Sequence, residues 1–156
     1  MERALSKWAP MPIRLIIGFG FLYHAGFKLF SAQGHGMFLG MLQNIGVPAA
    51  GLMAWGVGIV EFLGGLALIA GAFVSVVSAL LIINMLVALF TVHLPNGFNF
   101  INFTGMTDAG PQFGMPGYEV NLLYIAGLLA LLLGGPSHMS VDQKLAEKKA
   151  GGGSSM

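Results

Sequence analysis

The chain has 156 residues, of which 56% are apolar and only 8% are charged, and its mean hydropathy is +0.80. Soluble domains carry about 25% charged residues, so this composition excludes a freely soluble monomer and argues against a cytosolic enzyme. A net charge of +1 provides no basic surface for a nucleic-acid partner. The absence of cysteine excludes thiol–disulfide exchange, cysteine nucleophiles and cysteine-ligated iron–sulfur clusters.

Four apolar segments are long enough to cross a bilayer, whose hydrocarbon core takes about 20 residues of helix. We predict an all-α polytopic membrane protein, a four-helix transmembrane domain over residues 11–135, with spans near 11–30, 49–72, 74–94 and 118–135. The charged residues 1–7 precede an apolar run without a cleavage site, so this run is interpreted as the first span rather than a signal peptide. Residues 136–149 are expected to form a polar cytoplasmic tail, and 150–156 a flexible tail of the kind that cloning adds.

Positive charge predicts the orientation. The loops 31–48 and 95–117 contain no Lys or Arg, whereas six cationic residues flank the opposite ends of the spans: Arg3, Lys7, Arg14, Lys144, Lys148 and Lys149. By the positive-inside rule, both termini are cytoplasmic and both loops face outward from a bacterial inner membrane.

The two outer loops carry apolar residues of their own. The six-residue run Met37–Leu42 is too short to span and predicts a short helix on the membrane interface. The second loop alternates Asn with aromatic residues from Asn96 to Phe103. Two interpretations remain open, aromatic anchoring at the interface or a lid over a site at the outer end of the bundle.

Ionisable residues in the first two spans are candidates for function, because a charge in hydrocarbon is costly and usually faces the bundle interior. Helical periodicity places His24 and Lys28 one turn apart on one arc of the first span, with Arg14, Gly20 and Ser31. Extension of Arg14 and Lys28 towards the two membrane surfaces is the alternative. On the second span Glu61 shares a face with small residues that allow close helix packing. These residues are Ala50, Ala54, Gly58, Gly65 and Ala72, whereas Gly71 falls off that face.

Polar residues of the later spans complete the candidate set. Asn84 and Thr91 share a face of the third span, whereas His93 falls nearly opposite unless the last turn before Pro95 unwinds. Asn96 follows in the outer loop. Glu119 shares a face with four small residues and is therefore expected to point inward: Ala126, Gly127, Ala130 and Gly134. A structural ion-pair lock accounts for the inward carboxylates about as well as chemistry does.

Four blocks in chain order resemble one family. They are Tyr23-His24-Ala-Gly-Phe-Lys28-Leu29, Glu61-Phe-Leu-Gly64-Gly65, Asn84 to Phe98 with His93-Leu-Pro-Asn96-Gly97, and Gly117-Tyr118-Glu119. Together they resemble the DoxX family of four-helix bacterial membrane proteins from about Arg14 to Asp142. The resemblance implies a small inner-membrane protein of redox physiology, since members include a thiosulfate:quinone oxidoreductase subunit and proteins associated with detoxification of quinones, catechols or oxidants. This chain departs from the long outer domain of some members, which puts a complete thiosulfate-oxidising activity in doubt.

The first functional hypothesis is a quinone-handling protein with an outward-facing polar pocket. Quinone reduction needs hydrogen-bond donors to the two carbonyl oxygens and a proton relay. Glu61, His24 and Lys28 are candidate catalytic residues, with Glu61 as the inner end of a proton path. The chain has no flavin or dinucleotide motif, so electrons must come from a substrate, a redox partner protein or a metal. The residues expected to line the pocket are His24, Lys28, Glu61, Asn84, His93, Asn96 and Glu119.

Two alternatives compete with this hypothesis. The first is a non-catalytic scaffold or assembly partner of a redox complex. The composition is also compatible with a homo-oligomer of this chain. The second is copper or haem binding, since imidazole and thioether suit copper, although methionines of interfacial helices usually only pack. The depth of His24, about 10 Å below the helix end at 1.5 Å per residue, disfavours a haem shared with His93. The weak metal candidates are His35, Met37, Met41 and His93, with Met106 and Met115 on the same side.

The predicted orientation can be tested with alkaline phosphatase fused after Gly40 and after Gly110. Both fusions should be active, because this enzyme folds only outside the cytoplasm and both loops are expected there. A cytoplasmic reporter fused at the same positions should be inactive. Cytoplasmic activity at either position would overturn the orientation.

Overall fold

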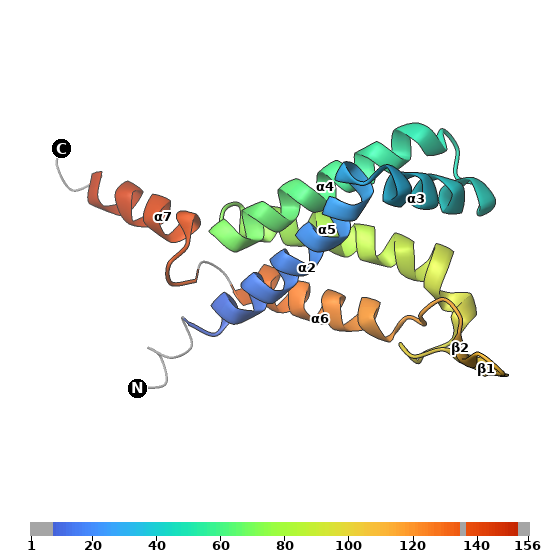
Figure 1. Ribbon diagram of the computed structural model, residues 1–156. Coiled ribbons are helices and arrows are strands. Elements are labelled where there is room, and N and C mark those ends of the chain that lie inside the picture. Colours follow the sequence, from blue (N-terminus) through green and yellow to red (C-terminus); the bar gives the residue numbers. More distant parts are fainter. Residues whose placement is uncertain (1–7, 135–136, 153–156) are drawn as a thin grey trace.

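The computed structural model describes residues 8–134 and 137–152. Within these ranges the helices are α2 (Pro10–Phe30), α3 (Ala32–Asn44), α4 (Ala50–Ala70), α5 (Val74–Ala88), α6 (Glu119–Gly134) and α7 (Val141–Gly152). A π-helical turn η1 (Leu89–His93) and a 3-10 turn η2 (Leu94–Asn96) extend α5, and strands β1 (Phe103–Thr107) and β2 (Gly110–Phe113) follow. Figure 1 shows α2, α4, α5 and α6 as a bundle, with α3 and the strands at its loop end and α7 at its terminal end.

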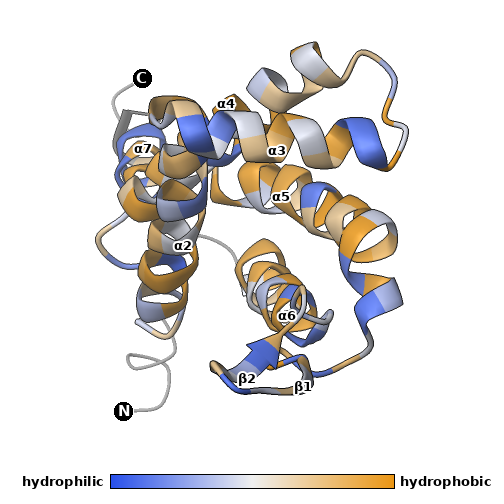
Figure 2. Ribbon diagram, turned by 45° about the vertical axis from the view of Figure 1, so that its right-hand side comes forward, coloured by the Kyte–Doolittle hydropathy of each residue, from blue (hydrophilic) through white to orange (hydrophobic). Residues whose placement is uncertain are grey.

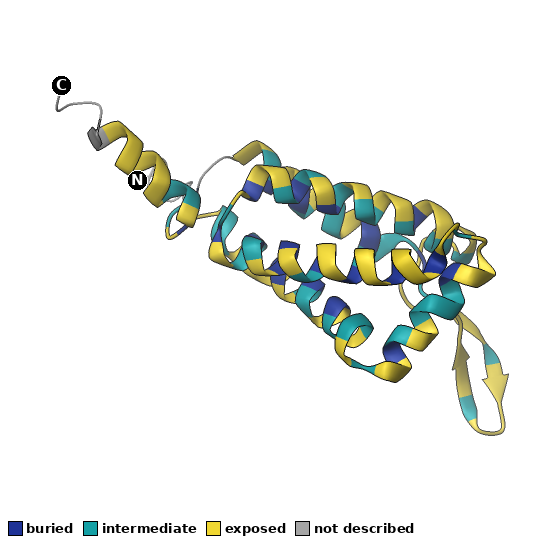
Figure 3. Cartoon of the chain, turned by 90° about the horizontal axis from the view of Figure 1, so that it is seen from above, coloured by how far each residue is buried: buried dark blue, intermediate teal, exposed yellow. Residues whose placement is uncertain are grey.

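The predicted helical membrane class is confirmed by three helices that are long and apolar enough to cross a bilayer. They run over Pro10–Phe30, Ala50–Ala70 and Val74–Asn96 and have 21, 21 and 23 residues. Figure 2 shows these ribbons as mainly apolar with hydrophilic segments between, and Figure 3 shows their exposed residues on the outer surface of the bundle. The fourth predicted span corresponds to α6, which has only 16 residues. At 1.5 Å per residue α6 covers about 24 Å of a ~30 Å core, so its membrane crossing and the orientation of the chain stay predictions.

Helices α2 and α4 are in close contact through facing glycines. A Cβ added to Gly65 would lie 2.7 Å from the backbone oxygen of Gly18, and one added to Gly18 would lie 2.9 Å from the backbone oxygen of Gly65. The predicted small-residue face of α4 is therefore confirmed, and Ala54, Gly58 and Glu61 are buried on it as well. Small residues allow this approach because no side chain lies between the two backbones.

The predicted inward face of the fourth helix is wrong at Ala126 and Ala130, which are exposed, whereas Gly127 packs against Ile17 of α2. The buried residues of α6 are Asn121, Leu128 and Leu131. Leu128 and Leu131 belong to the main apolar core, which is completed by residues of α2, α4 and α5: Ile17, Phe21, Leu68, Val74 and Leu81. The helix is apolar nearly all round, so its small residues identified only part of the packed side.

The two loops that are predicted to face outward contain more regular structure than their sequences predict. The first loop contains α3, which has 13 residues rather than six and begins where the Ser31 hydroxyl accepts a hydrogen bond from the Gly34 amide at 3.1 Å. The second loop contains an antiparallel hairpin that was not predicted, with Phe103 paired to Phe113 and Thr107 to Gly110. The hairpin projects from the loop end of the bundle.

At the terminal end, Arg14 is buried rather than extended towards the surface. Its side chain is 2% exposed and donates hydrogen bonds to the Ser137 hydroxyl at 2.8 Å and the Met139 carbonyl at 3.0 Å. The Asp142 carboxylate accepts from the backbone amides of Phe73 and Val74 at 2.8 and 2.9 Å. Asp142 thus caps the first turn of α5, and the predicted polar tail is tied to the bundle. Its α7 helix extends to Gly152, whereas Pro136 and residues 153–156 lie outside the described ranges.

The glycine contact predicts that Gly65→Ala destabilises the protein by more than about 1 kcal/mol, because the added methyl group overpacks a backbone contact. Gly56→Ala on the same helix is the matched control, since a Cβ there meets nothing within 4 Å. This control should be neutral or stabilising by up to about 1 kcal/mol. Thermal unfolding in detergent measures both changes, and equal shifts would contradict the assignment.

Gly71 is not a usable control, although it falls off the small-residue face. Its φ of +70° and a distance of only 2.5 Å from an added Cβ to the Ser140 Cβ make any side chain there strained. Gly71→Leu should therefore destabilise the protein, because the Arg14 and Ser140 side chains at the terminal end occupy the space.

Candidate functional site

A cavity of about 210 Å³ lies at the loop end, between α2, α4, α5 and α6. It brings together five of the seven residues that were expected to line a pocket, and these come from three different helices and the π-helical turn. The loop that contains the hairpin contributes Phe100, Pro116 and Gly117 to its wall. The lining residues are Phe21, His24, Lys28, Glu61, Asn84, Met85, Ala88, His93, Phe100, Pro116, Gly117, Val120, Asn121 and Tyr124.

A charged network forms one wall of the cavity. The Lys28 Nζ lies 2.7 Å from both carboxylate oxygens of Glu61, and the Asn84 Nδ2 donates a hydrogen bond to the Glu61 Oε1 at 2.9 Å. The side chains of Lys28 and Glu61 are 18% and 6% exposed. Lys28 therefore does not extend to the membrane surface, and the network compensates the cost of desolvating both charges.

Helix α3 covers this network. The Lys28 Nζ lies 4.4 Å from the centre of the Phe38 ring of α3, within the distance at which a cation is attracted to the face of an aromatic ring. The chain reverses between α2 and α3 at Ser31, so α3 folds back over the end of α2. As a result the ammonium group has a carboxylate on one side and an aromatic ring on another.

His93 reaches the cavity because the end of α5 is not an ideal α-helix. The turn over Leu89–His93 is π-helical, and its wider i→i+5 turn delays the rotation of the residues that follow. Asn84 and His93 therefore both line the cavity, whereas Thr91 is exposed and donates to the Val87 carbonyl at 2.8 Å. The His93 Nδ1 lies 2.9 Å from the Pro116 carbonyl, which fixes the ring.

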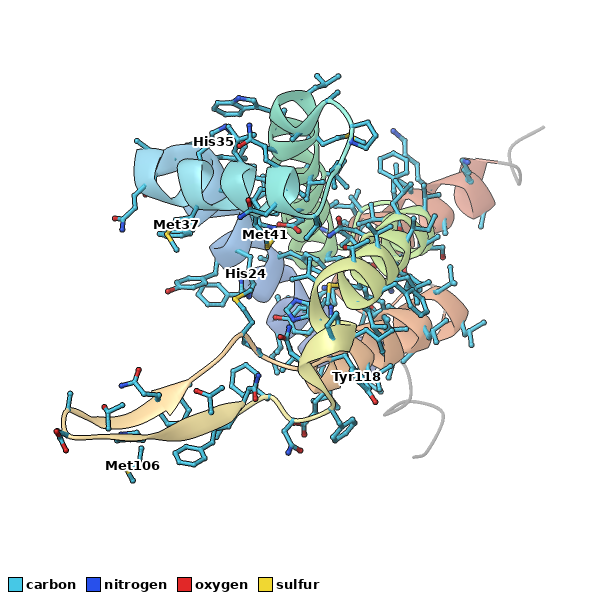
Figure 4. The ribbon with its side chains drawn as sticks, turned by 90° about the vertical axis from the view of Figure 1, so that its right-hand side faces the viewer. His24, His35, Met37, Met41, Met106 and Tyr118 are labelled. Carbon is cyan, nitrogen blue, oxygen red and sulfur yellow. The ribbon has the colours of Figure 1, made fainter. Side chains whose placement is uncertain are left out.

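His24 lines the same cavity without a hydrogen bond of its own among the described residues. Its ring packs edge-to-face against Tyr23, with ring centres 6.0 Å apart. In Figure 4, which looks onto the loop end, His24 lies on the side of the bundle between α3 and the hairpin. The imidazole is consequently free to bond to a ligand in the cavity.

Two cavity residues of α6 were missed. Asn121 is 3% exposed, and its Nδ2 approaches the Met85 carbonyl at 3.5 Å. Tyr124, one turn further along, directs its hydroxyl towards Gly20 of α2, which has no side chain in its way. The spacing of these two polar groups within an apolar span was the available signal, since residues three apart share a helix face.

Two expected pocket residues lie elsewhere. The Asn96 Nδ2 donates to the Val92 carbonyl at 2.9 Å and closes the end of the third helix. The Glu119 Oε2 accepts from the Phe100 amide at 3.0 Å, so Glu119 holds the loop that passes the cavity mouth. Neither residue is among the cavity lining.

The metal candidates do not gather in one place. His35 stacks on Trp55 with ring centres 4.3 Å apart, and its Nδ1 lies 3.0 Å from the Lys28 carbonyl. Met37 is 63% exposed and Met41 packs in a small core under α3, whereas His93 lies in the cavity wall (Figure 4). Within residues 8–134 and 137–152, no three His, Asp or Glu side chains are grouped so as to hold a metal ion.

Comparisons with known proteins agree with this arrangement. The DoxX family model matches residues 9–94, more than half of the chain. The uncharacterized membrane protein Rv3486 of Mycobacterium tuberculosis is 30% identical over 141 residues, which cover 87% of this chain and 80% of that protein. No solved structure shows a significant match. The family match covers α2, α4, the charged network and the π-helical turn, and the chain belongs to the DoxX family of integral membrane proteins.

Proposed function

We propose that this protein binds a quinone head group, or a similarly small redox-active ring, in the cavity at the loop end of the bundle. The observation that carries the proposal is the Lys28–Glu61–Asn84 network in the wall of a mainly apolar cavity. A volume of about 210 Å³ greatly exceeds the ~10–15 Å³ that one water requires. Concave apolar sites with a few convergent polar groups are typical of small-molecule binding.

The polar groups of the cavity suit the two ends of a quinone ring. A quinone accepts hydrogen bonds at two opposite carbonyl oxygens, and donors aimed at them stabilise the charge that develops on reduction. The Lys28 ammonium and the His24 ring are donors on α2, and the Tyr124 hydroxyl is a donor on α6. Glu61 would exchange a proton through Lys28, with which it is in direct contact.

Electrons must be supplied from outside the chain, since it has no cysteine and no flavin or dinucleotide motif. We propose that a redox partner protein or a small reductant delivers them, with the protein acting as part of a quinone-linked oxidoreductase. The proposed setting is a bacterial inner membrane, with α6 as the fourth crossing, residues 11–135 as the membrane domain and both termini cytoplasmic.

A structural role is the second candidate function, because the charged groups are satisfied within the protein. The Glu61 carboxylate is bonded by both Lys28 and Asn84, and Arg14 is held by Ser137 and Met139. A protein locked at both ends of its bundle would serve as a rigid membrane scaffold for a redox complex. Substitution of the ion pair distinguishes the two functions.

Glu61→Gln should lower the stability of the protein by about 3 kcal/mol, because it leaves the Lys28 charge buried without a partner. The double variant Lys28→Met with Glu61→Leu should recover most of this loss, since apolar residues of similar volume often replace a buried ion pair without cost. Thermal unfolding in detergent measures both variants. A Glu61→Gln protein as stable as the wild type would show that the pair is not a lock.

Complementation of a deletion strain with the same double variant separates binding from structure. If the cavity binds a ligand through Lys28 and Glu61, the double variant should be folded and inactive. If the pair is only a structural lock, the folded double variant should be active, which would contradict the first candidate function.

The head-group proposal predicts that a tail-less dimethoxy-methyl-benzoquinone binds the purified protein in detergent. His24→Gln should weaken this binding about tenfold, which corresponds to the loss of one hydrogen bond of about 1.4 kcal/mol. His138→Gln is the matched control, since His138 stacks on Trp8 at the terminal end and should bind like the wild type. Titration calorimetry measures both, and equal affinities of the two variants would exclude a contact with His24.

A further inference from the structure

A groove lies next to the cavity, between the loop that contains the hairpin and the first turns of α6. It has a volume of about 400 Å³ and is lined by Asn99, Phe100, Ile101, Glu119, Val120 and Leu123. Phe100 and Val120 line the cavity as well. These two side chains, one from the loop and one from the first turn of α6, therefore form a wall that the two hollows share.

The two hollows differ in what they offer a ligand. The cavity contains the charged network, whereas the middle of the groove is apolar and Asn99 and Glu119 are its polar members. Phe100, Ile101 and Leu123 are 51%, 67% and 65% exposed, and Leu123 lies on an apolar helix that packs in the membrane bundle. An apolar chain in this groove would have protein on one side and lipid tails on the other.

The groove has to give an apolar ligand tail a passage out of the cavity, and it does not have to bind the tail strongly. Lipid tails are as apolar as leucine side chains, so a ligand tail gains little free energy when it moves from lipid into the groove. The ligand would lose much more binding free energy if its head group were bound in the cavity and its tail had no passage to the outside. The position of Phe100 determines whether the tail has a passage out of the cavity. The Glu119 carboxylate fixes this position by accepting a hydrogen bond from the Phe100 amide at 3.0 Å.

We infer that the ligand of the cavity is an amphiphile, with its ring beside the Lys28–Glu61 pair and one apolar tail leaving between Phe100 and Val120 along the groove. The inference rests on the proposed function, because it assigns a tail to the same ring. The ligand enters sideways from the lipid along the groove, between residues 99–101 of the loop and the first turns of α6, and Glu119 is a positioning residue that keeps the exit open. This gives Glu119 a role at the mouth of the site, outside the cavity itself.

Photo-crosslinking tests the path of the tail. The probe is the same benzoquinone ring with a decyl tail that carries a diazirine near its end, added to the protein in lipid nanodiscs. Labelling should concentrate on residues 99–101 and 119–123, and an excess of the tail-less ring should suppress it there by tenfold or more. A decane chain with the diazirine and no ring should label lipid-facing residues generally and should not be suppressed.

Leu123→Trp provides a second measurement, because Leu123 lines the groove and is not among the residues that line the cavity. It should weaken binding of the decyl-tailed ring about tenfold and leave the tail-less ring unchanged. Leu122→Trp is the matched control, since Leu122 is an exposed neighbour on α6 outside both hollows. It should bind both rings like the wild type.

The outcomes separate the inference from the proposed function. If the tail-less ring binds but the tailed probe labels other helices, or if Leu123→Trp affects both rings equally, the tail path is wrong and the head-group site stands. If neither ring binds the wild-type protein, the proposed function fails and the inference fails with it.

Discussion

The buried ion pair between Lys28 and Glu61 is the constraint on which the rest of the bundle depends. A carboxylate within an apolar helix is tolerated only where a cation and further donors compensate its lost hydration. Lys28 lies near the end of α2, so this end must approach the middle of α4, and the two backbones must come close at Gly18 and Gly65. The fold of α3 over the ammonium group then shields the pair from solvent.

The same constraint accounts for the cavity. The contacts between α2 and α6 lie further towards the terminal end, where Tyr124 faces Gly20 and Gly127 faces Ile17. Because α2 is held against α4 at the loop end, the space between α2 and α6 stays open there and the π-helical turn presents His93 to it. An arrangement that stabilises the bundle thus also creates a concave site with polar groups, and the two roles proposed for Glu61, structural and ligand-binding, are consequences of one geometry.

The terminal end is held by a different set of bonds. The segment that follows α6 binds Arg14 and caps α5 through Asp142, so the α4–α5 connection and α7 are tied together by polar contacts. These contacts lie far along the chain from the helices that they join, with Asp142 capping Phe73 across 69 positions. Arg14, one of the charges that predict the orientation, therefore has individual partners and is a structural residue as much as a topological signal.

The sequence by itself determined the membrane class, the four apolar segments, the small-residue face of α4 and five of the cavity residues, because these follow from composition and from the cost of a charge in hydrocarbon. Tertiary structure decided the partners: that Lys28 meets Glu61, that Glu119 holds Phe100, and that Asn121 and Tyr124 face the cavity. Helical periodicity assumes an ideal α-helix, so it could not predict the direction of His93 at the end of a π-helical turn. It also could not predict the packed side of α6, because nearly every face of this helix is apolar. The bonds of Arg14 join residues 123 and 125 positions apart, which no local pattern reports.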